Sequence, residues 1–94
     1  MNVRVENMRT ASGGYAANQF KIWTDDGVIF QSYRSIIAKR QAGNRSRGAY
    51  IITLYEPYWN MYSATTNRYL LQFLNEDSIR DVRAKVKSGE YLTE

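Results

Sequence analysis

The sequence contains no cysteine and no histidine. Without cysteine, the chain cannot build a disulfide framework, a thiolate metal site or a cysteine nucleophile. Without histidine, it lacks the commonest general base, the commonest metal ligand and the usual near-neutral pH switch. The acidic residues are scattered apart from the pairs Asp25-Asp26 and Glu76-Asp77. We therefore predict that the protein is not an enzyme and needs neither a metal nor a cofactor.

Long apolar runs are also missing. No stretch approaches the roughly 20 apolar residues of a membrane span, and the N-terminal MNVRVENMRT has no apolar core of a secretory signal. Hydrophobic residues make up 44% of the 94 residues, which is ordinary for a globular protein and too high for a disordered one. We expect one domain, residues 1–94, located in the cytoplasm and without a membrane partner.

The charge is uneven along the chain. The formal net charge is +4, and residues 1–75 hold nine Lys and Arg against four Asp and Glu. Residues 76–94 hold four against five. A basic excess of this size is compatible with nucleic acid or with an acidic protein partner.

The stretch from Asn18 to Arg40 organises the predicted fold. Two β-rich runs flank Asp25-Asp26-Gly27, and Asp-Gly between such runs favours a hairpin with a type I′ turn. The alternation places four apolar side chains toward the core: Phe20, Ile22, Val28 and Phe30. Trp23 then falls on the other face with Lys21, where it is either a binding platform or a residue covered by a helix.

A second hairpin is predicted after the first. The run from Val28 to Ala38 reads as one long strand with a bulge or bend at residues 32–35, or alternatively with a short helical turn there. Residues 39–47 form a basic tip, and residues 49–56 form the return strand, which ends before Pro57.

The C-terminal third has helical spacing. Residues 63–75 predict a short helix capped by Ser63 or Thr65, and residues 76–94 a second helix capped by Ser78, followed by a tail. With a β-rich body over residues 1–62, the fold class is α+β. The expected architecture is an antiparallel sheet of three to five strands, built from two successive hairpins, with one or two helices on one face.

Two groups of residues could contact a partner. Arginine on a flexible tip can grip phosphates or carboxylates, and tyrosine and tryptophan are favoured at interfaces and stack on bases. The candidate binding residues are Arg34, Lys39, Arg40, Arg45, Arg47, Tyr33, Tyr58 and Trp59.

Several motifs resemble a family of small proteins encoded by tailed phages. The pattern is N-x-R-T-x-S-G, then N-Q-F, then F-Q-S-Y-x-S-x-I-A, then Y-S-x-T-T-x-x-Y-x-x-x-F-L. It runs over residues 7–74 and begins at Asn7. Two departures are Asn60-Met61, where similar proteins tend to have Trp-Asp, and the added helix after Asn75.

The resemblance implies a phage origin and action in the bacterial cytoplasm, but it brings no activity. Its polar positions could form a network that locks hairpin to helix, or they could line a ligand-reading surface. These positions are Asn18, Gln19, Gln31, Ser32, Thr65 and Thr66.

The leading hypothesis is a non-enzymatic phage accessory protein that binds a host protein or ribonucleoprotein, for example to inhibit a bacterial defence system such as CRISPR. The alternative is a nucleic-acid-binding module that uses the basic tip and exposed tyrosines. A small-ligand binder and a homodimer also stay open.

Overall fold

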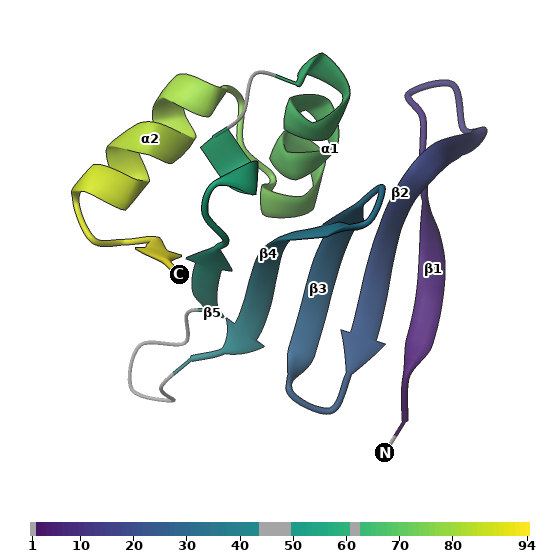
Figure 1. Cartoon of the computed structure of the whole chain (residues 1–94), viewed down its shortest axis with the longest axis horizontal. Coiled ribbons are helices and arrows are strands. Elements are labelled where there is room, and N and C mark those ends of the chain that lie inside the picture. Colours follow the sequence, from purple (N-terminus) through teal and green to yellow (C-terminus); the bar gives the residue numbers. More distant parts are fainter. Residues whose placement is uncertain (1, 44–49, 61–62) are drawn as a thin grey trace.

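The computed structural model describes residues 2–43, 50–60 and 63–94 (Figure 1). The elements, in chain order, are β1 (Arg4–Arg9), β2 (Tyr15–Thr24), β3 (Gly27–Ser32), β4 (Ser35–Ala42), β5 (Tyr50–Leu54), the 3-10 helix η1 (Tyr58–Asn60), α1 (Ala64–Leu74), α2 (Ile79–Lys87) and β6 (Leu92–Thr93). Neither described helix is long and apolar enough to cross a membrane.

The strands of the described residues form one sheet in the order β1-β2-β3-β4-β5-β6. All neighbours are antiparallel except β5 and β6, which are parallel. The predicted α+β class is confirmed. The sheet has six strands rather than three to five. The two predicted strand pairs, β2 with β3 and β4 with β5, are both present and antiparallel, and they belong to a meander of the first five strands. The additional edge strand β6 comes from the segment predicted as a tail.

Both helices begin at serine caps that the sequence predicts. The Ser63 hydroxyl accepts a hydrogen bond from the Thr66 backbone N–H at 3.2 Å, and the Ser78 hydroxyl accepts one from the Asp81 N–H at 3.1 Å. Each bond satisfies an N–H group that the first turn leaves unpaired. Beyond α2, Gly89 adopts a positive φ of 84°, which ends the helix.

The predicted long strand from Val28 to Ala38 is interrupted by a tight turn. Ser32 pairs with Ser35, so Tyr33 and Arg34 alone connect β3 to β4. Tyr33 has a left-handed backbone with φ 55°, which is uncommon for a residue other than glycine. The prediction of one bent strand was wrong because neither connecting residue, Tyr33 or Arg34, is of a type that usually marks a turn.

The faces of β2 are also reversed relative to the prediction. Thr24 pairs with Gly27, so the turn between β2 and β3 contains only Asp25 and Asp26 and the register of β2 against β3 differs by one residue from the predicted one. Trp23 lies opposite the buried Val28 and therefore shares the helix-covered face. Phe20 and Ile22 lie on the open face, so their assignment to the core was wrong. The alternative in which Trp23 is covered is the one that the structure adopts.

The core lies between the helices and one face of the sheet. Phe30 of β3 stacks on Phe73 of α1, with ring centroids 5.7 Å apart, and Leu54, Leu70 and Val82 are fully buried around them. Figure 1 shows the helices gathered over one end of the sheet, at the β4 and β5 side. Among the described residues, no helix lies over the opposite face of the sheet or the outer edge of β1 (Figure 1).

Candidate functional site

A surface hollow lies where the β3–β4 turn meets the N-terminus of α1. It has a volume of about 240 Å³. Its lining comes from β3, the turn, β4, η1 and the first turn of α1, and comprises Ser32, Tyr33, Ser35, Ile37, Tyr58, Ser63 and Thr66. We call this feature the tyrosine hollow. It brings together segments 34 residues apart in sequence, as the contact between Ser32 and Thr66 shows.

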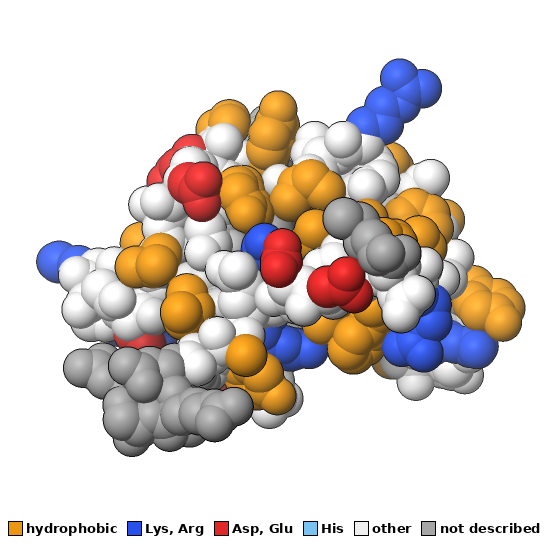
Figure 2. Space-filling view, turned by 90° about the horizontal axis from the view of Figure 1, so that it is seen from below, with side chains coloured by type: hydrophobic (Ala, Val, Ile, Leu, Met, Phe, Trp, Pro, Cys, Tyr) orange, Lys and Arg blue, Asp and Glu red, His pale blue; other side chains and the backbone are white. Residues whose placement is uncertain are grey.

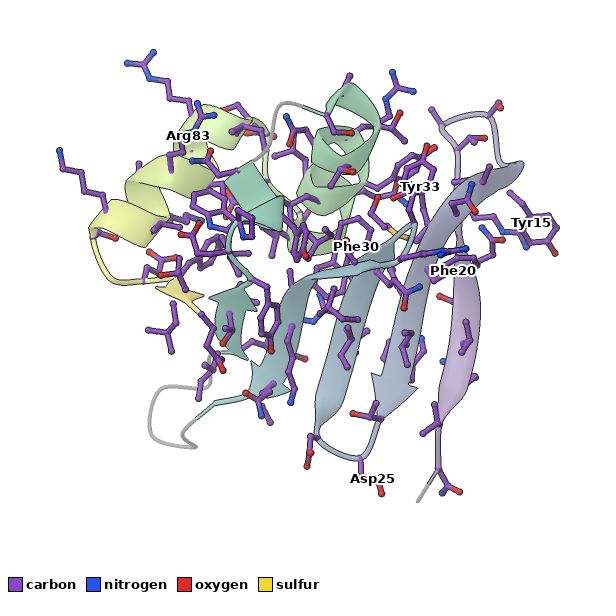
Figure 3. All side chains as sticks on the ribbon, in the orientation of Figure 1. Tyr15, Phe20, Asp25, Phe30, Tyr33 and Arg83 are labelled. Carbon is purple, nitrogen blue, oxygen red and sulfur yellow. The ribbon has the colours of Figure 1, made fainter. Side chains whose placement is uncertain are left out.

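Tyr33 is held at the edge of the hollow by its own backbone. Its N–H donates to the Asn18 carbonyl at 2.7 Å, and the Gln31 side-chain amide donates to the Tyr33 carbonyl at 2.8 Å. The Tyr33 side chain is 53% exposed at the end of the sheet opposite Asp25 (Figure 3). A fixed backbone with an exposed ring lowers the entropy that binding would cost.

Tyr58 is positioned by its neighbour in η1. Trp59 is only 4% exposed and packs in the core, and its backbone N–H donates to the Tyr55 carbonyl at 3.1 Å. Tyr58 itself is 42% exposed at the hollow. Trp59 was a candidate contact residue, and the structure instead buries it because its large apolar surface anchors η1.

A buried hydroxyl pair joins the sheet to α1 under the hollow. Ser32 Oγ and Thr66 Oγ1 are 2.9 Å apart, and both residues are buried. Gln19 lies beside Ser32 in register and is fully buried, but its side-chain amide has no hydrogen-bond partner among the described residues. Thr65 is exposed in the first turn of α1.

The predicted polar residues therefore have different placements. Asn18 and Gln31 hold the turn of Tyr33, and Ser32 with Thr66 fastens α1 to β3. Gln19 and Thr65 make no side-chain hydrogen bond to these four in the described structure. These four residues therefore make two separate sets of hydrogen bonds, one at the turn of Tyr33 and one between β3 and α1, and not one continuous network.

The chemistry of the hollow suits binding. Hydroxyl groups and phenol rings surround the buried aliphatic side chain of Ile37. Such a lining offers hydrogen bonds at the rim and apolar contact at the floor, as small pockets at protein interfaces do. Among the described residues, no group of three or more His, Cys, Asp or Glu side chains is placed to hold a metal ion.

Sequence reasoning did not select every residue of the hollow. Ser35, Ile37 and Ser63 were not among the candidates for the site, although all three belong to the motifs. The available signal was the F-Q-S-Y-x-S-x-I-A and Y-S-x-T-T patterns, whose members converge here.

The basic candidates do not form one surface in the described structure. Arg34 is exposed in the β3–β4 turn, at the end of the sheet away from Ala42. Lys39 lies opposite Ile29 on the open face, whereas its neighbour Arg40 projects to the covered face. There, Arg40 lies 5.1 Å from the Phe73 ring centroid and donates to the Phe73 carbonyl at 3.3 Å.

Arg45 and Arg47 lie outside the described residues. Among the side chains drawn in Figure 2, the Lys and Arg groups are dispersed between apolar and acidic ones.

A cluster of ionisable groups fixes α2 and the C-terminal segment. Lys85 Nζ lies 2.6 Å from Glu76 Oε2, and the Tyr91 hydroxyl donates to the same carboxylate oxygen. Burial, and to a smaller extent the hydrogen bond to Glu76, raise the pKa of Tyr91 to about 12. Burial alone would raise the pKa of Glu76, but hydrogen bonds from Lys85 and Tyr91 lower it overall. We call Glu76, Lys85 and Tyr91 the clamp, because Lys85 and Tyr91 both bind the same carboxylate oxygen of Glu76.

Comparison with known proteins places these features in a family. A model described as a family of unknown function (DUF8033) matches residues 3–89, which include all of the tyrosine hollow. No curated protein and no solved structure matches the chain.

Proposed function

The chain belongs to DUF8033, a family of unknown function, and we propose that it is a non-enzymatic phage accessory protein that binds a host component through the tyrosine hollow. The partner is a bacterial protein or ribonucleoprotein, for example a component of a defence system such as CRISPR. The phage origin and cytoplasmic action rest on the resemblance of the motifs to small proteins of tailed phages.

One observation carries the proposal. Tyr33 and Tyr58 are both exposed and both line a hollow that also contains the buried aliphatic side chain of Ile37, and each tyrosine has neighbours that are buried or hydrogen-bonded. Tyrosines of this kind supply large contact area and a polar group at low entropic cost, and they are enriched among the residues that dominate binding energy. An inserted side chain of a partner would meet both rings and the hydroxyl rim.

The alternative, a nucleic-acid-binding module, rests on the net charge of +4 and on the basic segment. Lys39 and Arg40 project to opposite faces, and Arg40 is already engaged with Phe73. A phosphate backbone needs cations on one continuous surface. The described residues therefore favour a protein partner.

The test is affinity capture from lysate of the bacterial host. The wild-type chain, tagged at either end, is compared with the double variant Tyr33→Ala/Tyr58→Ala. We expect wild type to enrich a defined partner and the double variant to lose it by about 100-fold, as expected for two such contact residues. Ribonuclease treatment of the lysate separates a protein partner from a ribonucleoprotein.

The matched control is Tyr15→Ala, because Tyr15 is 70% exposed and lies on β2, outside the hollow. Equal loss of the partner in this control, or no defined partner with either tag, would overturn the proposal. Generic single- and double-stranded oligonucleotides at low salt test the alternative. Salt-dependent binding would support it, and no binding would eliminate it.

A further inference from the structure

The outer edge of β1 is the longest unpaired strand edge in the described structure. β1 is the first strand of the sheet and pairs only with β2, so one side of its backbone has no strand beside it. Val3 and Val5 are 55% and 61% exposed there. Unpaired N–H and C=O groups in a row are a template for pairing with another strand.

The usable part of this edge is short and well defined. The register between β1 and β2 is regular from Arg4 to Asn7 and shifts between Asn7 and Arg9. A shift of this kind twists the strand and ends regular pairing. Any strand that adds to this edge must therefore align with the segment centred on Val5.

We propose that a second copy of the chain pairs antiparallel with this segment, about a two-fold axis at Val5. Directly opposed residues of antiparallel strands share a face. In this register Arg4 of each copy faces Glu6 of the other, and the two Val5 side chains face each other. Charged residues on an edge strand usually disfavour pairing with another strand. The charges of β1 are nevertheless complementary when two copies of β1 pair in this register.

Neighbouring registers lack this complementarity. A two-fold axis at Arg4 sets the two Arg4 side chains against each other, and an axis at Glu6 does the same for the two carboxylates. Like charges directly opposite each other destabilise a strand pair. The sequence of β1 thus selects the register centred on Val5 over both alternatives.

The open face of the sheet supports the same arrangement. Val5 lies opposite Ile22, which lies opposite Ile29, so an apolar row crosses β1, β2 and β3 on the face without helices. Pairing of two β1 strands joins the rows of both copies at Val5 into one strip. On the other face, the Arg4 guanidinium lies 5.0 Å from the centroid of the Trp23 ring in β2, so it must turn toward the outer edge of β1 to meet Glu6 of the second copy.

The test is a charge swap measured by sedimentation velocity up to about 1 mM chain, the concentration at which even weak association is detected. Arg4→Glu alone and Glu6→Arg alone each turn the two opposed pairs repulsive. We expect each to weaken dimerisation about ten-fold or more. The double variant Arg4→Glu/Glu6→Arg restores opposite charges and should return the affinity to near that of wild type.

Mixing gives a second readout. An equimolar mixture of the two single variants places only opposite charges across the axis, so the mixture should dimerise more strongly than either variant alone. Lys87→Glu is the control, because it changes the net charge as Arg4→Glu does at an exposed site on α2. Circular dichroism confirms that each chain is folded.

A wild-type chain that stays monomeric up to about 1 mM overturns the proposal, and the charges of β1 then serve only to protect the edge. A dimer that responds equally to Lys87→Glu, or not at all to the single swaps, also overturns it by assigning the contact to another surface. Neither result bears on the tyrosine hollow, since Tyr33 and Tyr58 are unchanged in every variant.

Discussion

At the scale of single residues, Gly27 lies close to the backbone of β4. A Cβ atom built there would lie 2.2 Å from the Arg40 carbonyl oxygen, and φ is +151°. Both the clash with backbone and the conformation oppose any side chain. We predict that Gly27→Ala lowers the free energy of unfolding by about 2–4 kcal/mol, measured by urea denaturation.

Gly13→Ala separates the two causes of this loss. Gly13 also has a positive φ, +92°, but apart from its chain neighbours no described residue has an atom within 4 Å of the position that a Cβ would take. Its substitution should cost only the conformational strain, about 1 kcal/mol. Equal losses for the two variants would show that the close approach of β3 to Arg40 is unimportant.

Two turns explain why parts of the prediction from sequence were wrong. The first was taken as Asp25-Asp26-Gly27, but Thr24 pairs with Gly27, so Phe20 and Ile22 lie on the face opposite to Val28 and Phe30. The second contains Tyr33, whose φ is 55°. At Tyr33 the left-handed backbone is held by hydrogen bonds to residues outside the turn, which a local sequence pattern cannot reveal.

At the scale of elements, the hydroxyl pair between β3 and α1 should behave as a unit. Ser32→Ala or Thr66→Val leaves the other hydroxyl buried without its partner, at a cost of about 1–3 kcal/mol. In Ser32→Ala/Thr66→Val both polar groups are gone. We predict that the double variant loses less stability than the sum of the single losses, with a coupling of about 1 kcal/mol in a double-mutant cycle from urea denaturation.

Binding of the host partner provides the corresponding functional measurement. Because this pair fastens the N-terminus of α1 to the turn of Tyr33, the single variants should also weaken capture of the partner. Additive stability losses would contradict the inferred coupling, and unchanged capture would show that α1 need not be fastened for the hollow to work.

The elements themselves were predictable to different degrees. Ser63 and Ser78 are local signals, since each bonds to a residue three positions later, and both helices followed from them. The site was only partly predictable. Tyr33, Tyr58, Ser32 and Thr66 were named in advance, but their convergence depends on the β3–β4 turn. Strand β6 could not be predicted, because two residues gain strand character only from β5.

At the scale of the whole molecule, the two proposed surfaces lie on different parts of the sheet. The tyrosine hollow is built from β3, β4, η1 and α1, whereas the proposed self-pairing edge is β1 (Figure 1). A dimer through β1 would leave both hollows accessible. It would therefore present two binding sites to a partner, and linked sites bind more strongly than single ones when the geometry allows both to engage.

The clamp at Glu76 makes the stability of the folded chain depend on pH. Burial alone would raise the pKa of the Glu76 carboxyl in the folded chain, but hydrogen bonds from Lys85 and Tyr91 outweigh this effect and lower the pKa below the ordinary value of 4.5. A lowered pKa contributes stability that is present above pH 4.5 and is lost as the pH falls below it. We predict that Glu76→Gln lowers Tm by about 5–15 °C at pH 7 and by much less at pH 3, measured by thermal denaturation.

Glu90→Gln is the matched control for the clamp. Glu90 also approaches Lys85, at 3.6 Å, but its side chain is 60% exposed, and solvent-exposed ion pairs contribute little. This variant should shift Tm by only about 0–3 °C at either pH. A Glu76→Gln effect that is the same at pH 3 as at pH 7 would contradict the clamp, because the stability that the lowered pKa of Glu76 contributes declines as the pH falls below 4.5. Such a result would mean that Glu76 acts through packing rather than through its charge.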